Sequence, residues 1–107
     1  MNQEILQVNA NLFRRSVADG GKLVVYEDGL LFKPHKFNLD TSNVWIPLSE
    51  IKNIEKFNSM FIIPNGLRIN CQLSSFDFVV SKREKTMEII KQLLIGEQAW
   101  TRFLNTL

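Results

Sequence analysis

The most constraining feature of this chain is a change of hydrophobic period near residue 81. From Leu6 to Val80, short apolar segments follow the two-residue alternation of β-strands, with turn residues between them. From Ser81 onward, apolar residues recur at intervals of three and four, which is the period of an α-helix. An amphipathic helix can cover the apolar surface that a small sheet leaves open. The pattern therefore predicts a small β-barrel or β-sandwich capped by a C-terminal helix.

The strand region contains two clear alternations and three turn signals. Leu6–Leu12 and Leu67–Leu73 alternate apolar with polar residues and predict half-buried strands. Glu27–Gly29 lies between two apolar runs and predicts a tight hairpin, since Asp-Gly tolerates positive φ. Asp19–Gly21 and Pro64–Gly66 predict two further reversals. For residues 51–57 a strand is preferred over a helical turn.

The C-terminal region predicts one capping helix and a helical extension. Ser81 and Glu84 have the spacing of a capping box, so a helix is expected over residues 82–95. Gly96 allows a stop or a kink, and residues 97–107 form a second amphipathic segment. The residues expected to pack on the sheet are Met87, Ile90 and Leu94.

Length and composition indicate one globular domain. The 107 residues, 45% of them hydrophobic and 22% charged, fit a single domain over 1–107 with its barrel at 5–80. Thirteen Lys and Arg are mixed with eleven Asp and Glu, so no nucleic-acid partner is expected. With one cysteine and no apolar stretch of about 18 residues, the sequence predicts a cytoplasmic protein, or one peripheral to a membrane.

The sequence contains no constellation that predicts catalysis. His35 is the single histidine, which removes the usual multi-histidine zinc sites. Cys71 falls in an alternating strand, where a buried small side chain is the expected role. Glu27 and Asp28 are explained by their turn. We therefore expect a protein that is not an enzyme, with no catalytic residue, metal or cofactor.

Three spaced motifs carry a resemblance to a known family. Gly29–His35 reads GLLFKPH, Ile46–Ile51 reads IPLSEI and Pro64–Ile69 reads PNGLRI. Together with residues 78–80 and 83–84, they resemble bacterial GRAM domains of the pleckstrin-homology-like superfamily. The resemblance implies two roughly orthogonal antiparallel sheets, about seven strands in all, capped by a C-terminal helix.

The resemblance also implies a binding module, because members of this superfamily bind proteins, peptides or phosphoinositides on one scaffold. Protein interaction or self-association as a homodimer is the first hypothesis. Peripheral binding to anionic phospholipid or phosphoinositide headgroups is the alternative. The residues predicted to contact anionic lipid are Arg14, Arg15, Lys22, Lys33, His35, Lys36 and Phe37.

A second group of residues predicts an interaction surface. Its members are Phe61, Ile62, Trp100, Phe103 and Leu107. For the apolar run 60–63, burial is the preferred interpretation and an exposed partner surface is the alternative. Trp100 and Phe103 are large anchors that pack either against the barrel or against another chain. The sequence leaves these two arrangements equally open.

Overall fold

Seven antiparallel strands, one 3₁₀ helix and one α-helix form the chain in a computed structural model, which describes residues 3–14, 17–36, 38 and 40–107. The predicted mainly β fold with a C-terminal helix is confirmed. The elements are β1 (Glu4–Arg14), β2 (Val17–Tyr26), β3 (Gly29–Pro34), β4 (Val44–Pro47), η1 (Leu48–Glu50), β5 (Ile51–Ser59), β6 (Ile63–Cys71), β7 (Ser75–Val80) and α1 (Arg83–Asn105).

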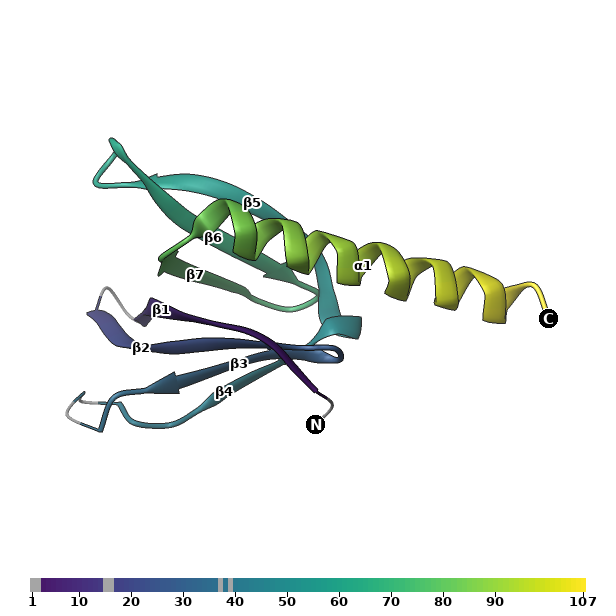
Figure 1. Ribbon diagram of the computed structural model, residues 1–107, viewed down its shortest axis with the longest axis horizontal. Coiled ribbons are helices and arrows are strands. Elements are labelled where there is room, and N and C mark those ends of the chain that lie inside the picture. Colours follow the sequence, from purple (N-terminus) through teal and green to yellow (C-terminus); the bar gives the residue numbers. More distant parts are fainter. Residues whose placement is uncertain (1–2, 15–16, 37, 39) are drawn as a thin grey trace.

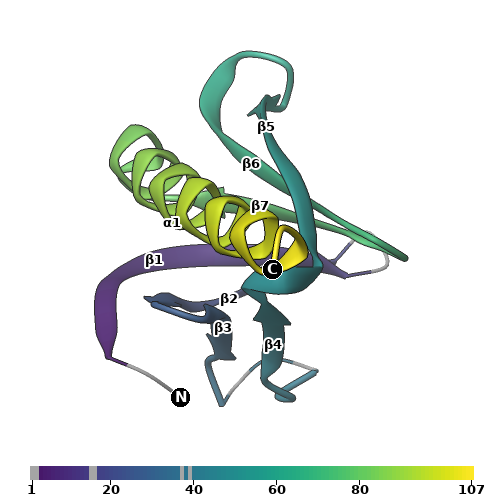
Figure 2. The same cartoon turned by 90° about the vertical axis from the view of Figure 1, so that its right-hand side faces the viewer.

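The strands form one continuous sheet in the order β4-β3-β2-β1-β7-β6-β5. β1 pairs with β2 along most of its length and with β7 through residues 10–12, so it joins the two parts of the sheet. The sheet curls into a half-barrel, and α1 crosses its β5–β6 side before extending beyond it (Figures 1 and 2). α1 contacts β5, β6 and η1, the short helix that links the edge strands β4 and β5.

The core lies inside the curl of the sheet. The alternation predicted for β1 is observed, since Val8, Ala10 and Leu12 are buried while Asn9 and Asn11 are exposed. Because the sheet curls, β3 and β7 face each other although two strands separate them in the sheet. Their aromatic rings, Phe32 and Phe78, lie 5.8 Å apart between centroids, and both side chains are fully buried. The helix contributes Met87, Ile90 and Leu94, as predicted.

The predicted β2–β3 hairpin is confirmed, but Gly29 is needed for a different reason than positive φ. Tyr26 pairs with Gly29 across a two-residue turn, and neither turn residue has positive φ. Gly29 instead allows a close approach, because a Cβ at this position would lie 2.6 Å from the carbonyl oxygen of Ile46. The strand expected over residues 51–57 is also confirmed and extends to Ser59.

Two of the predicted chain reversals are wrong, because their glycines lie inside strands. Asp19–Gly21 lies within β2, where a Cβ on Gly21 would meet the Lys33 carbonyl oxygen at 2.2 Å. Pro64–Gly66 lies within β6, and Gly66 sits under the ring of its cross-strand partner Phe57. The β5–β6 chain reverses earlier, over residues 60–62. Close packing, and not turning, explains these glycines.

The predicted capping box is also wrong. Ser81 donates hydrogen bonds from its backbone N–H and its hydroxyl to the Asn9 carbonyl oxygen on β1, at 3.0 and 3.4 Å. Lys82, with φ of 53°, stands at the N-cap of α1, and no side chain caps the helix there. The Glu84 carboxylate instead accepts a hydrogen bond from Lys56 on β5. Sheet contacts therefore replace the local cap.

The helical extension predicted beyond Gly96 is present, but the predicted stop or kink at Gly96 is absent. The segments expected at 82–95 and 97–107 form one continuous helix from Arg83 to Asn105. A glycine inside a helix costs about 1 kcal/mol relative to alanine, which is too little to end it. The C-terminal part of α1 extends beyond the barrel (Figure 1), and the last buried residue of the helix is Leu94. Within the described residues, no helix is both long and apolar enough to span a membrane.

Candidate functional site

Arg14, a predicted lipid contact, is held inside the fold. Its guanidinium Nη1 lies 2.8 Å from the Asp40 carboxylate, and its Nε lies 3.3 Å from the carboxylate of buried Asp19. It also donates hydrogen bonds to the Ser42 hydroxyl and carbonyl oxygens at 3.0 and 2.8 Å. The Arg14 side chain is only 18% exposed. It therefore ties the end of β1 to the β3–β4 connection and has little charge left for an external anion.

Asp40 completes this cluster. Hydrogen bonds from the Ser42 hydroxyl and backbone N–H, followed by the charge of Arg14, lower the pKa of the Asp40 carboxyl. Asp40 therefore stays ionised under mildly acidic conditions. The cluster stabilises a connection between strands, and its sequence signal is weak because Arg14 and Asp40 lie far apart in the chain.

The other predicted lipid contacts are distributed over neighbouring strands. Lys22 on β2 hydrogen-bonds to Asn9 and pairs in register with exposed Lys33 on β3. The backbone N–H of His35 donates to the Gly20 carbonyl oxygen at 2.9 Å, and the residue is exposed. Lys36 is also exposed. Arg15 and Phe37 lie outside the described residues.

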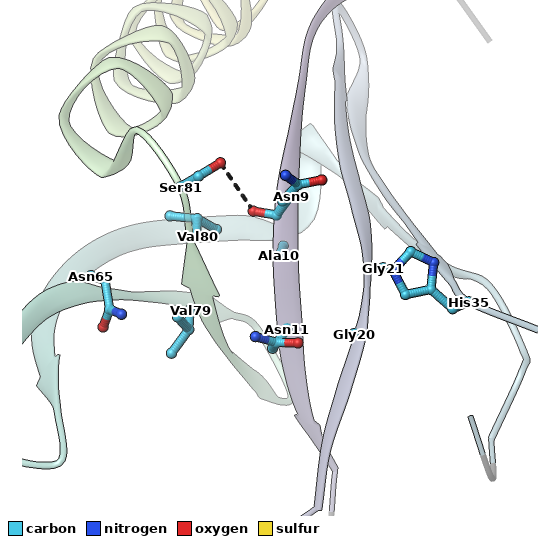
Figure 3. A pocket seen from close by; sticks show the side chains of 10 residues that line it. All are labelled: Asn9, Ala10, Asn11, Gly20, Gly21, His35, Asn65, Val79, Val80 and Ser81. Atoms are coloured by element: carbon cyan, nitrogen blue, oxygen red, sulfur yellow. Dashed lines mark hydrogen bonds between the residues drawn. The ribbon is translucent and has the colours of Figure 1, made fainter. Parts of the chain in front are cut away.

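A shallow hollow of about 440 Å³ lies on the outer face of β1, β2 and β7 (Figure 3). Amide and imidazole side chains surround it together with two valines and backbone. Such groups form hydrogen bonds but supply no acid–base pair. Its lining residues are Asn9, Ala10, Asn11, Gly20, Gly21, His35, Asn65, Val79, Val80 and Ser81.

No metal-binding group of three or more histidine, cysteine, aspartate or glutamate residues occurs in the part of the chain that the structure describes. Cys71 lies at the end of β6 and is partly buried. Burial, and to a lesser extent the charge of Glu50, raises the pKa of its thiol. A raised thiol pKa lowers the fraction of the reactive thiolate, which does not suit a nucleophile.

The β5–β6 turn presents a fully exposed apolar tip. Phe61 is 95% exposed, and Met60 and Ile62 are each 79% exposed. The preferred interpretation of this run as buried packing is therefore wrong. The Ile62 N–H donates to the Ser59 carbonyl oxygen, and the two central residues have φ of 50° and 68°. Bulky side chains rarely adopt such φ values. Neither burial in the core nor the preference of the turn therefore explains why Met60 and Phe61 occupy these positions.

The end of α1 carries the second exposed apolar group. We call residues 95–107 the outer segment. Trp100 and Phe103 are 57% and 51% exposed, and Leu107 is 87% exposed. The two aromatic rings stack on each other, with centroids 5.5 Å apart. These anchors therefore do not pack into the barrel of their own chain. Of the two arrangements that the sequence left open, packing against the barrel is excluded.

The helix changes its apolar face after Leu94. Successive residues turn by about 100°, so the positions in line with Leu94 beyond it are Gln98, Thr101 and Asn105. These polar residues line a hollow of about 550 Å³ beside η1. Trp100 is turned by about 120° from that line. The polar residues at 98, 101 and 105 are a sequence signal for this change of face. An analysis of the spacing of apolar residues alone does not detect it.

The apolar positions of the outer segment continue a line that begins on the barrel. We call this line the flank stripe; its members are Ile89, Leu93, Gly96, Trp100, Phe103 and Leu107. Ile89 and Leu93 are partly buried against the core, whereas the later members are exposed. Leu104 lies beside the stripe and is 48% exposed. Thus the stripe loses its intrachain partners where the helix leaves the barrel.

Comparisons with known proteins give a fold and no family. No protein-family model matches the sequence, and no curated protein matches it. The structure is similar to a solved one described as the C-terminal domain of an unknown protein from Leishmania infantum. The TM-score is 0.76 at 18% sequence identity, over 87% of this chain and 84% of that chain. This likeness shows the fold: a curled antiparallel sheet followed by one C-terminal helix.

Proposed function

We propose that this chain is a non-catalytic protein-interaction module that associates with a second copy of itself through the outer segment of α1. The observation that carries this proposal is the exposure of stacked Trp100 and Phe103 on a helix that has left its own barrel. Large aromatic side chains dominate binding energy when a partner covers them. The polar line Gln98, Thr101 and Asn105 faces the barrel side instead, so the apolar flank is available to another molecule.

The size of the surface fits reversible association. Covering the exposed halves of Trp100 and Phe103 removes about 200 Å² from water in each chain. At about 25 cal/mol per Å², that contributes about 5 kcal/mol per chain, or about 10 kcal/mol for two chains. Association costs about 4–15 kcal/mol in lost freedom of motion. This cost is of the same size as the gain, and about 400 Å² in all is well below the roughly 1,200 Å² of a stable interface, so the two rings alone support only weak association. The rest of the apolar flank has to contribute, and we expect a dimer that forms at high concentration.

The proposal includes a GRAM-like, pleckstrin-homology-like scaffold with two roughly orthogonal sheets. The GLLFKPH, IPLSEI and PNGLRI motifs, and the succession of seven strands and one C-terminal helix, support this assignment. On such a scaffold a projecting helix can bind a partner without disturbing the barrel. We propose a cytoplasmic location for the same module.

The test is the molar mass in solution, measured by light scattering after size-exclusion chromatography over a wide range of concentration. We expect the wild-type mass to rise from monomer toward dimer and Trp100→Glu to remain monomeric. Ile95→Glu is the matched control, because Ile95 is 59% exposed on the opposite flank of the same helix. It should associate like the wild type. A monomeric wild type at every concentration would refute self-association.

A second candidate function is peripheral binding to anionic phospholipid, and the β5–β6 tip favours it. The tip lies at the same end of the molecule as the C-terminal ends of β1 and β3 (Figure 1). Lys33 lies near the C-terminal end of β3, Lys36 follows that strand and Lys82 directly precedes α1, and all three are exposed. The acidic β2–β3 turn is at the other end of the sheet (Figure 1). Apolar side chains at a convex tip can enter a bilayer while nearby cations attract its headgroups.

Co-sedimentation with vesicles tests this second function. Neutral vesicles are compared with vesicles containing phosphatidylserine, at low and at physiological salt. We expect binding to the anionic vesicles that weakens with salt and is lost in Phe61→Asp and in Lys33→Glu/Lys36→Glu. Leu73→Asp is the control for Phe61→Asp, because Leu73 is 99% exposed in the β6–β7 turn. Equal loss in both aspartate variants, or no binding by the wild type, would exclude tip insertion.

A further inference from the structure

We propose that two copies of the chain pair through α1 in antiparallel orientation, with Trp100 of each copy seated against Gly96 and Ala99 of the other. This inference rests on the proposed self-association and specifies its geometry. It follows from three features of the helix: the spacing of the flank stripe, the gap at Gly96 and the uncharged residues along one border of the stripe.

The flank stripe has the spacing of a coiled-coil seam. Its members follow one another at intervals of four, three, four, three and four residues. In heptad terms, Leu93, Trp100 and Leu107 occupy a positions, and Ile89, Gly96 and Phe103 occupy d positions. A seam of this kind packs against one facing helix. The stripe is thus suited to a helical partner, and another copy of α1 offers the same seam.

Gly96 interrupts the seam with a gap that its own chain does not fill. A Cβ built on Gly96 would meet nothing within 4 Å. Intrachain packing therefore does not require a glycine here, although glycine is a poor residue for the middle of an exposed helix. A large side chain from a facing helix would fill the gap. Trp100, one helical turn away, is the largest side chain on the seam.

Only one relative direction places Trp100 opposite this gap. In an antiparallel pair, a positions face d positions, so Trp100 faces Gly96 of the second copy and Leu93 faces Phe103 of the second copy. Ile89 then faces Leu107. In a parallel pair, each residue faces its own copy, which leaves a void between two glycines and sets two tryptophans against each other. Shape complementarity therefore favours the antiparallel direction.

Charge along the seam permits two identical helices to approach. One border of the stripe is formed by Gln92, Ala99 and Thr106, which are exposed and uncharged. In the antiparallel pair, Ala99 meets Ala99 at the twofold axis, and Gln92 meets Thr106 of the second copy. Small residues at Gly96 and Ala99 allow the closest approach near this axis. On the other border, the two Glu97 side chains face each other, so Glu97→Gln should tighten the dimer severalfold.

Cysteine cross-linking tests the direction without altering the seam itself. In a Cys71→Ser background, Gln92→Cys and Thr106→Cys are prepared as separate full-length variants, one with a size tag, then mixed and oxidised mildly. We expect the mixed 92–106 cross-link to exceed both self-cross-links at least tenfold. Ile95→Cys, on the opposite flank, measures cross-linking by random collision. The molar mass of each sample is measured in parallel by light scattering.

The outcomes separate the geometry from the proposed function. A dominant mixed cross-link in a dimer supports both. Self-cross-links 92–92 and 106–106 in a sample of dimeric mass would overturn the antiparallel geometry while self-association stands. A monomeric mass, with cross-linking no greater than that of Ile95→Cys, would overturn both. As a second measurement, Gly96→Leu should weaken the dimer at least tenfold without destabilising the monomer, because leucine favours the helix more than glycine does. An unaffected dimer would refute the role of the gap.

Discussion

The indole of Trp100 stacks on the ring of Phe103, with centroids 5.5 Å apart and planes 25° from parallel, on a part of α1 that has no buried side chain. The last buried residue of the helix is Leu94. The buried residues of the helix therefore stabilise the barrel, whereas the outer segment carries the surface that we propose for association. Each can be changed without the other.

Removing residues 96–107 should leave the barrel stable. A helix end without tertiary contacts is marginal in water, so its loss should change the free energy of unfolding of the monomer by about 1 kcal/mol or less. Urea unfolding of a dilute sample, where the wild type is monomeric, measures this change. Association should disappear in the same variant. A loss of several kcal/mol would mean that the outer segment packs on the barrel.

The β5–β6 turn should become more stable when its residues suit its backbone. Met60 and Phe61 occupy the two central positions with positive φ, where Asn-Gly is preferred. Met60→Asn/Phe61→Gly should raise the free energy of unfolding by about 1–2 kcal/mol through relief of strain. Thermal and urea unfolding provide the measurement. Phe61→Ala removes the exposed ring but keeps a Cβ, so it should raise the free energy of unfolding much less. An equal increase would argue against backbone strain.

Replacing Arg14 should destabilise the fold through Asp19. Asp19 is 3% exposed, and its carboxylate lies 3.3 Å from the Arg14 guanidinium. Arg14→Leu leaves this buried charge without its partner, which should cost about 3 kcal/mol. Arg14→Leu/Asp19→Asn should recover much of the loss. Urea unfolding of the wild type, both single variants and the double variant gives the coupling, and simple additivity would contradict the paired role.

The titration of Glu84 should report the contact between α1 and β5. The hydrogen bond from Lys56, followed by the charges of Lys56 and Arg83, lowers the pKa of the Glu84 carboxyl. A lowered folded-state pKa stabilises the fold above the unfolded-state pKa, and this stabilisation is lost as the pH falls through the folded-state pKa. Lys56→Gln should move the Glu84 pKa upward toward its ordinary value, as measured by NMR titration. No movement would mean that the contact does not persist in solution.

Local sequence patterns predicted the elements well where neighbouring residues decide the outcome. The alternation in 6–12 and 67–71 corresponds to strands because every second side chain enters one core. The predicted strand 67–73 is too long, since Leu73 lies in the β6–β7 turn and is 99% exposed. The hairpin at Glu27–Gly29 was predicted from its turn residues, and the helix with Met87, Ile90 and Leu94 inside was predicted from the three- and four-residue spacing of its apolar positions. Predictions based on glycines and caps failed more often. Gly21, Gly66 and Ser81 have partners on other strands, and the sequence does not place those strands.

The candidate site, too, was only partly predictable from the sequence. The sequence by itself determined that a β region precedes a helix. It also showed large apolar residues at a strand end, Phe61, and in the last part of the helix, Trp100 and Phe103. The tertiary structure alone decided that Arg14 is paired and that the β5–β6 tip is exposed. It also decided that α1 leaves the barrel after Leu94. The physical reason is that burial depends on which distant surfaces meet, and the curl of the sheet sets this by bringing strands far apart in the chain around one core.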